Sequence, residues 1–312
     1  MRIIVLDGKN KNPGDLSWAE LQALGEVTIY PTSTAEEAAE RVVDAEILLV
    51  NKVKVNGALM DKAPGLKLIV ETATGYDNID LAAAAERGIV VSNVPSYATQ
   101  SVAQHTMALL LEINNRVGLH AESVAKGDWC RSSEFCYFLT PLHQLAGKTM
   151  LVVGYGRIGR ATARLAEAFG MRVIWVDSYQ EGSLSLEEAL PQADVVSLHC
   201  NMKPGNKAMI NAETIALMKD GVILLNTARG ALLDEQAVAD ALKSGKIAYA
   251  GVDVLSKEPP VATNPLLSAP NCIITPHISG CSVEARANLL AVCCENVRAF
   301  LAGSPVNVVQ TK

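Results

Sequence analysis

The stretch Leu151-Val-Val-Gly154-Tyr-Gly156-Arg-Ile-Gly159 decides the fold. It continues an apolar run that predicts a strand, and it opens a helical pattern that extends to Phe169. In such a strand–turn–helix unit the first glycine allows the tight turn, the second lets a pyrophosphate approach the backbone, and the third lets helix and strand pack closely. The amides at the helix start, at the positive end of the helix dipole, then hold the anion. The stretch therefore predicts a dinucleotide-binding turn.

An acidic residue in the right place supports this interpretation. Asp177 stands at the end of the next predicted strand, 18 residues after Gly159. A carboxylate there accepts hydrogen bonds from a ribose diol and repels a 2′-phosphate, and no Arg follows at 178 or 179. The prediction is therefore NAD rather than NADP. The alternative, a structural glycine turn followed by a surface Asp, accounts for the glycines but not for this combination.

Short β-branched runs alternate with amphipathic helical stretches along nearly the whole chain, a pattern typical of βαβ units and parallel sheets. One series of six predicted strands, the count of a complete dinucleotide-binding sheet, begins with the strand before the glycines. Its members are 149–153, 172–176, 194–198, 222–226, 248–252 and 272–275. An earlier series comprises 2–6, 27–29, 47–50, 68–70 and 89–91. Between these five, helices are expected at 35–43, with Thr34 as its cap, and at 81–87, ended by Gly88.

Two long helical patterns, 100–125 and 283–301, bracket the second series. They suggest that the chain crosses over, builds a second domain and returns to the first. The predicted fold class is α/β, with two doubly wound parallel-sheet domains, a Rossmann cofactor domain being inserted into a flavodoxin-like substrate domain. We expect the substrate domain to comprise residues 1–98 and 282–312, and the NAD-binding domain to comprise residues 99–281.

The composition excludes several classes of protein. Of the 312 residues, 27 are Lys or Arg and 33 are Asp or Glu, so the net charge of −6 offers no basic surface for nucleic acid. No stretch approaches the roughly 18 apolar residues of a membrane span, and Asp7 ends the apolar start too early for a signal peptide. Seven cysteines without a C-x-x-C pair argue against disulfides and structural zinc, so we expect a cytoplasmic protein without a metal.

Three polar residues follow predicted strands of the second series, namely Arg229, Glu258 and His277. Ligands of open α/β sheets bind outside the carboxyl ends of the strands, so the three side chains are expected near one crevice. A guanidinium can grip a carboxylate in bidentate fashion, and an imidazole can deliver the proton that accompanies hydride transfer. A neighbouring carboxylate would orient the ring. Taken singly, the Arg could brace a loop, the Glu-Pro could form a turn, and the His could simply be packed.

The ordered set of these motifs resembles the D-isomer-specific 2-hydroxyacid dehydrogenase family over essentially the entire chain. The motifs are 154–159, Asp177, Asn226-Thr-Ala-Arg229-Gly, Asp253 with Glu258-Pro, Pro276-His277, the first-domain loop 73–80 and the crossover segments 93–97 and 101–105. The resemblance implies that NADH reduces a small 2-oxo acid, with hydroxypyruvate or glyoxylate favoured, to the D-2-hydroxy acid. It implies that Arg229 binds the substrate and that His277, assisted by Glu258, donates the proton.

The resemblance also implies further site residues. The cofactor-binding residues would be Gly154, Gly156, Arg157, Ile158, Gly159, Asp177, Thr227, Ala228, Asp253 and Gly280. The substrate-binding residues would be Val53, Thr74, Gly75, Arg229 and His277.

Within the family, the segment 133–148 is most similar to glycerate dehydrogenases, also called hydroxypyruvate reductases. The segment Ile278-Ser-Gly-Cys281 departs from them, because it lacks the bulky Trp that they often carry there. Two alternatives therefore stay open, a phosphoglycerate dehydrogenase-like enzyme and a non-catalytic NAD(H)-sensing binding protein of the same fold. The apolar stretch Trp129–Leu139 is either a dimer arm or a loop covering its own core, and the resemblance favours the arm and a homodimer.

Overall fold

The computed structural model describes residues 1–203 and 205–309. The chain divides into two compact units. The first unit contains Met1–Ala98 and the segment that begins at Gly280, and the second unit is Thr99–Ser279. Within the described ranges, no helix has the length and apolar character needed to cross a bilayer.

The first unit is built on a five-stranded parallel sheet in the order β2-β1-β3-β4-β5, which is a doubly wound, flavodoxin-like order. Its strands are β1 (Arg2–Val5), β2 (Glu26–Ile29), β3 (Ile47–Val50), β4 (Leu68–Glu71) and β5 (Val90–Ser92). Its helices are α1 (Ala19–Gln22), α2 (Ala35–Arg41), α3 (Gly57–Met60), α4 (Leu81–Glu86) and α12 (Val283–Leu301), with a 3-10 turn at Gly8–Asn10.

Both faces of this sheet are covered, which explains its almost continuous apolar strands. Successive side chains of a strand point to opposite faces. Ile3 and Val5 pack in one cluster with residues of α1 and α12, while Ile4 and Leu6 pack in another with residues of α2, α3 and α4. The last long helix of the chain therefore completes a core that the first strand begins.

The predicted starts of the helices in this unit are confirmed, whereas α2 and α4 end two residues and one residue earlier than predicted. Thr34 caps α2 through a capping box, since its side chain accepts from the Glu37 amide and the Glu37 carboxylate accepts from the Thr34 amide. Asp80 caps α4, and Gly88 follows that helix with a φ of +65°, a conformation that glycine adopts without strain.

The second unit is built on a six-stranded parallel sheet in the order β11-β10-β9-β8-β6-β7. Its strands are β6 (Thr149–Val153), β7 (Arg172–Val176), β8 (Val195–Leu198), β9 (Val222–Asn226), β10 (Ile247–Val252) and β11 (Cys272–Ile274). Its helices are α5 (Thr99–Asn115), α6 (Val117–Ala125), α7 (Asp128–Arg131), α8 (Arg157–Ala168), α9 (Leu186–Ala189), α10 (Ala212–Leu217) and α11 (Glu235–Ser244), with 3-10 turns at Leu190–Gln192, Gly230–Leu232 and Pro265–Ser268.

The count of six strands is confirmed, and their order places the crevice. The chain adds β7 on one side of β6 and then crosses over to add β8 on the other side. The direction in which strands are added to the sheet therefore reverses at β6. A dinucleotide sheet of order 3-2-1-4-5-6 has one more strand beyond the equivalent of β7. In the part of this sheet that the structure describes, β7 is an edge strand. The sixth strand, β11, is instead added at the opposite edge, next to β10.

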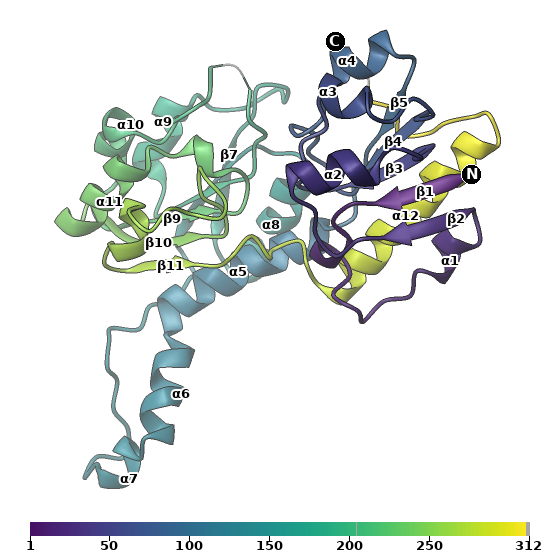
Figure 1. Ribbon diagram of the computed structural model, residues 1–312. Helices are drawn as coiled ribbons and strands as arrows, with labels where there is room; N and C mark the ends of the chain where they lie inside the picture. Colours follow the sequence, from purple (N-terminus) through teal and green to yellow (C-terminus); the bar gives the residue numbers. More distant parts are fainter. Residues whose placement is uncertain (204, 310–312) are drawn as a thin grey trace. The chain divides into compact units, whose positions relative to one another are not determined.

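The helix expected over 100–125 is broken. Arg116 lies between α5 and α6 with a φ of 48°, a left-handed conformation that is uncommon for a non-glycine residue. Two residues earlier, the Asn114 side chain donates to the Leu110 carbonyl at 2.7 Å. A change of direction at one residue does not alter the spacing of the apolar residues. The sequence pattern therefore continues from α5 into α6 and does not reveal the break. After the break, α6 and α7 extend away from the sheet of this unit (Figure 1).

Candidate active site

The three glycines after β6 have the geometry that their predicted roles require. Gly154 has a φ of +95°, and a Cβ there would lie 2.5 Å from the Cys200 amide nitrogen. A Cβ on Gly159 would lie 2.0 Å from the Gly154 carbonyl oxygen, so only glycine lets α8 pack this closely on its strand. A Cβ on Gly156 would meet no heavy atom within 4 Å. The backbone at Gly156 is thus open to an approaching group.

Helix α8 begins directly at this opening. Gly156 is its N-cap and supplies no side-chain cap, and Arg157, Ile158 and Gly159 form its first turn. The first amides of a helix and the positive end of its dipole favour an anion. The open glycine and the uncapped helix start together fit the pyrophosphate of a dinucleotide.

Asp177, the residue predicted to bind the ribose, lies one residue after β7. Its Oδ2 accepts from the Tyr155 amide at 2.7 Å, and its Oδ1 accepts from the Tyr179 amide at 2.8 Å. The carboxylate thereby ties the glycine turn to the end of the next strand. Each carboxylate oxygen can accept more than one hydrogen bond, so this half-buried group retains capacity for a diol.

Arg229 is positioned by a buried residue that sequence reasoning missed. Asn226 ends β9 with no exposed surface. Its Nδ2 donates to the Arg229 carbonyl at 2.9 Å, and its Oδ1 accepts from the Ala228 amide at 3.0 Å. A polar amide at the end of an otherwise apolar strand was the available signal. Thr227, beside it, shares a 3.0 Å hydrogen bond with the Thr106 hydroxyl of α5.

Asp253 organises the loop that carries His277. Its carboxylate is almost fully buried and accepts from the Thr275 hydroxyl at 2.6 Å and from the amides of Ile278 and Ser279 at 2.9 and 2.8 Å. Its backbone carbonyl accepts from the His277 amide at 2.9 Å. Nε2 of His105, a residue of α5, lies 2.9 Å from the Thr275 hydroxyl.

His277 and Glu258 form a direct pair. Nδ1 of His277 lies 2.6 Å from Oε2 of Glu258, and Oε1 of Glu258 accepts from the Leu255 amide at 3.1 Å. Their side chains are 39% and 31% exposed, so the pair is reachable from solvent. An imidazole fixed by a carboxylate at one nitrogen presents its other nitrogen in a defined direction.

The structure brings the three predicted catalytic residues to one edge of one sheet. Arg229, Glu258 and His277 follow β9, β10 and β11, which are neighbours in the sheet and all parallel. The loops after β9 and β10 are in close contact, since a Cβ on Gly230 would lie 1.9 Å from the Leu255 carbonyl carbon. The carboxyl end of β6, with its glycine turn, belongs to the same edge.

Four of the predicted site residues lie in the first unit. Val53 donates its amide to Asp7, and Thr74 donates its hydroxyl to the Val94 carbonyl at 2.8 Å. Gly75 follows Thr74 in the loop after β4. Gly280, predicted to line the cofactor, is grouped with the first unit, and a Cβ there would lie 3.3 Å from the Ala98 Cβ.

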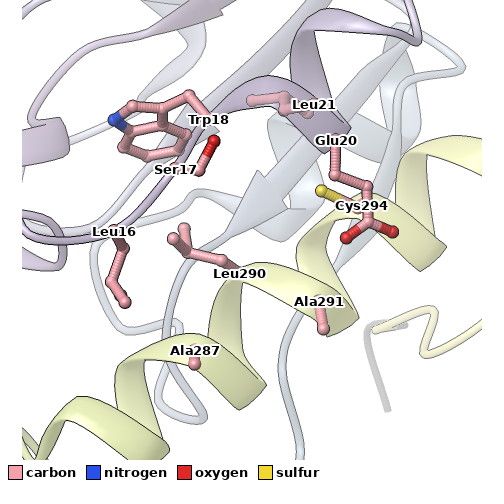
Figure 2. Close-up of a pocket in the computed structure, with 9 residues that line it drawn as sticks. All are labelled: Leu16, Ser17, Trp18, Glu20, Leu21, Ala287, Leu290, Ala291 and Cys294. Atoms are coloured by element: carbon pink, nitrogen blue, oxygen red, sulfur yellow. The ribbon is translucent and has the colours of Figure 1, made fainter.

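Two features elsewhere lack the groups that the predicted chemistry needs. A cavity of about 180 Å³ in the first unit lies between the segment around α1 and the helix α12, and Figure 2 shows its mostly apolar lining. Its Glu20 pairs with Arg298 at 2.9 Å, and burial raises the pKa of its Cys294 thiol to about 11. In the second unit, burial lowers the pKa of His199 to about 4, so this imidazole is neutral at neutral pH. Within the described part of the chain, no cluster of three or more His, Cys, Asp or Glu could hold a metal ion.

Comparison with known families gives one model that covers more than half of the chain. Residues 107–279 match the model described as "D-isomer specific 2-hydroxyacid dehydrogenase, NAD binding domain". The matched range contains the glycine turn and all three polar residues discussed above.

Curated relatives and solved structures extend the similarity over the rest of the chain. A hydroxypyruvate reductase from Blautia hydrogenotrophica is 46% identical, over 99% of this chain and 99% of its own length. A glycerate dehydrogenase from Methylorubrum extorquens is 44% identical, over 89% and 90% respectively. The crystal structure of a D-lactate dehydrogenase from Aquifex aeolicus, complexed with NAD and lactic acid, is 31% identical and superposes with a TM-score of 0.82 over 97% of this chain and 96% of that one.

Proposed function

The chain belongs to the D-isomer-specific 2-hydroxyacid dehydrogenase family of NAD-dependent oxidoreductases, and we propose that it reduces hydroxypyruvate or glyoxylate to the corresponding hydroxy acid. The observation that carries the proposal is the 2.6 Å pair of His277 and Glu258 at the sheet edge that also holds Arg229 and the glycine turn. The names of the two curated relatives favour this substrate class.

The residues of the second unit divide the chemistry among them. Bound NADH supplies the hydride that adds to C2 of the oxo acid. The Arg229 guanidinium grips the substrate carboxylate and polarises the neighbouring carbonyl. Protonated His277 gives a proton to the carbonyl oxygen as negative charge develops there, and Glu258 stabilises the ring while it is positively charged. His277 is then reprotonated from solvent.

We further propose which residues hold the two ligands. In the second unit, the amides around Gly156, Arg157 and Ile158 hold the pyrophosphate and Asp177 accepts from the adenosine ribose. The other proposed cofactor contacts are Gly154, Gly159, Thr227, Ala228, Asp253 and Gly280. In the first unit, the backbone near Val53, Thr74 and Gly75 binds the substrate carboxylate. On this assignment Thr99–Ser279 is the NAD-binding domain and the first unit is the substrate domain.

A panel of 2-oxo acids tests the substrate. NADH consumption is followed with hydroxypyruvate, glyoxylate, pyruvate and phosphohydroxypyruvate, and the reverse reaction is run with D- and L-glycerate. We expect hydroxypyruvate or glyoxylate to give the highest kcat/KM, and only the D-isomer to be oxidised. A clear preference for phosphohydroxypyruvate would instead identify a phosphoglycerate dehydrogenase-like enzyme, and no turnover of any acid would support an NAD(H)-sensing binding protein.

We propose that the stretch Trp129–Leu139 is the dimer arm of a homodimer. It leaves large apolar side chains in solvent, with Phe135 at 92% and Phe138 at 71% exposure, so it does not cover a core of its own. Several large apolar side chains exposed within one short segment are typical of an interaction site. The wild-type mass by light scattering should be that of two chains, and F135S/F138S should shift it to one. A monomeric wild type would refute the arm.

We also propose a cytoplasmic location. No two cysteines form a disulfide in the ranges that the structure describes, and Cys130 and Cys136 are exposed. Reduced surface thiols suit a reducing compartment. Fractionation of the native cells should recover the NADH-dependent activity with the cytoplasm, and recovery with an extracellular fraction would contradict this.

A further inference from the structure

Two carboxyl groups of the first unit lie buried at the carboxyl ends of its strands, and the mechanism above uses neither. Asp7 follows β1 and is 4% exposed, while Glu71 ends β4 and has no exposed surface. Both come from strands near the position where the order 2-1-3-4-5 changes direction. Buried carboxyl groups are expensive unless they are paired, hydrogen-bonded or neutral, so their surroundings are informative.

Asp7 has the surroundings of a charged carboxylate. It accepts from three consecutive backbone amides, those of Asn51, Lys52 and Val53, at 2.9, 2.5 and 3.3 Å. Amide donors compensate a buried negative charge, although burial still raises the pKa of Asp7 above its ordinary value. Asp7 therefore holds the loop that follows β3.

Glu71 is held differently, through a single side chain. Its Oε2 accepts from Asn78 Nδ2 at 2.9 Å, and the same Nδ2 donates its second proton to the Val53 carbonyl at 3.1 Å. The Asn78 carbonyl in turn accepts from the Val55 amide at 2.8 Å. Asn78 thus joins Glu71, the loop after β3 and the loop after β4 into one hydrogen-bonded unit.

We propose that Glu71 is a positioning residue, which fixes Asn78 and through it the two loops that carry Val53, Thr74 and Gly75. This proposal rests on the proposed function, because those three residues are the substrate contacts suggested above. Glu71 itself touches neither substrate nor cofactor.

Glu71 does this as an uncharged acid. Burial is the main cause that raises the pKa of Glu71 to about 9, and the nearby Asp7 carboxyl acts in the same direction. The hydrogen bond from Asn78 lowers this pKa, as do Lys52 and Lys11, but these influences do not cancel the effect of burial. The Cys293 thiol of α12 also faces it. Its Oε1 receives no hydrogen bond from any residue in the described ranges, an arrangement that a buried carboxylate tolerates poorly. At neutral pH Glu71, with a pKa of about 9, therefore remains protonated.

The protonation is tested through stability, without any activity measurement. A group that binds a proton only in the folded state makes unfolding easier as pH rises between its two pKa values. For Glu71 these are the ordinary value of 4.5 and about 9. In this range the unfolding constant of the wild type should rise about tenfold per pH unit relative to that of Glu71→Gln, which cannot ionise. Parallel stability curves for the two proteins would overturn the neutral acid.

The positioning role is tested with Glu71→Ala and its rescue by Glu71→Gln. With the 2-oxo acid that the panel selects, Glu71→Ala should raise KM at least tenfold while kcat and NADH affinity change little. Glu71→Gln keeps an acceptor for Asn78 and should restore KM. The double variant Glu71→Ala/Asn78→Ala should be no worse than either single one, because both remove the same link.

A matched control and a readout independent of turnover complete the experiment. Ser92 is another buried polar residue, on the neighbouring strand β5, and its hydroxyl donates to the Val306 carbonyl. The control variant Ser92→Ala removes this hydroxyl and should leave KM unchanged. Amide hydrogen exchange at 51–55 and 73–79 should accelerate in Glu71→Ala but not in Ser92→Ala. Unchanged exchange in Glu71→Ala would overturn the positioning role even if no tested acid were a substrate.

Discussion

Nδ1 of His277 lies 2.6 Å from Oε2 of Glu258, on a backbone held at a φ of 55°. Asp253 holds this strained conformation in place, because its backbone carbonyl and its carboxylate accept hydrogen bonds from the amides of residues 277 to 279. Non-glycine residues in this region occur where the surrounding structure over-determines them, which is common at functional sites. The orientation of the His277–Glu258 pair is therefore fixed by the buried Asp253 as well as by the hydrogen bond between the two side chains.

Replacing His277 with alanine should remove the proton donor. General acid catalysis contributes about 10²–10⁴ in rate, so kcat for the preferred oxo acid should fall by that factor. NADH binding, measured by fluorescence titration, should be unchanged. His143→Ala, an exposed imidazole elsewhere in the same unit, serves as the control and should keep the wild-type rate. A His277→Ala enzyme with near-normal turnover would refute the assigned role.

Replacing Glu258 with glutamine should change the pH dependence more than the fold. The amide can still accept from Nδ1 but no longer stabilises the positively charged ring. Since reduction needs the protonated imidazole, the fall in rate on the alkaline side should move to lower pH. The measurement is kcat against pH, with the exposed Glu187→Gln as control. A profile identical to that of the wild type would count against the pairing.

Two glycine substitutions should separate cofactor binding from folding. Gly156→Ala places a Cβ in open space, so the melting temperature should be unchanged while the Kd for NADH rises at least about tenfold, or 1.4 kcal/mol. Gly159→Ala places a Cβ 2.0 Å from a carbonyl oxygen and should lower the free energy of unfolding by about 1–3 kcal/mol or more. Equal NADH affinity in Gly156→Ala and the wild type would show that the pyrophosphate binds elsewhere.

Replacing Asp177 with asparagine should weaken the discrimination against NADPH. The substitution removes the negative charge that repels a 2′-phosphate, so the ratio of kcat/KM for NADH over NADPH should fall by at least about tenfold. Thermal unfolding checks the fold, because the carboxylate also accepts from the Tyr155 and Tyr179 amides. An unchanged ratio in a stable variant would remove Asp177 from the ribose site.

The sequence predicted what depends on local pattern. The strands, the helix cap at Thr34 and the glycine turn follow from periodicity and backbone geometry, and each is present. The reversal at Arg116 was missed, because a single left-handed residue leaves the apolar spacing intact. Gly280 falls outside the unit that holds the other predicted cofactor residues, since a motif match does not locate a unit boundary.

Buried polar residues were the hardest to foresee. Asn226 hydrogen-bonds to the backbone of Arg229 three residues further on, whereas Asp253 hydrogen-bonds to the more distant loop that carries His277. Glu71 lies one residue beyond the predicted strand 68–70, and it ends β4 in the structure. Only the three-dimensional arrangement shows that its partner Asn78 also binds Val53. The sequence thus predicted which polar residues follow the strands, and it did not predict the hydrogen bonds that hold the loops carrying them.

The interrupted first unit has a consequence for how the protein is made. The core that contains Ile3 and Val5 also needs Leu289 and Val297 of α12, near the end of the chain. The second unit is continuous from Thr99 to Ser279 and can acquire all its strands while the ribosome is still translating α12. The half that is synthesised first is therefore finished last. Until α12 has been synthesised, the N-terminal sheet lacks the helix that covers one of its apolar faces.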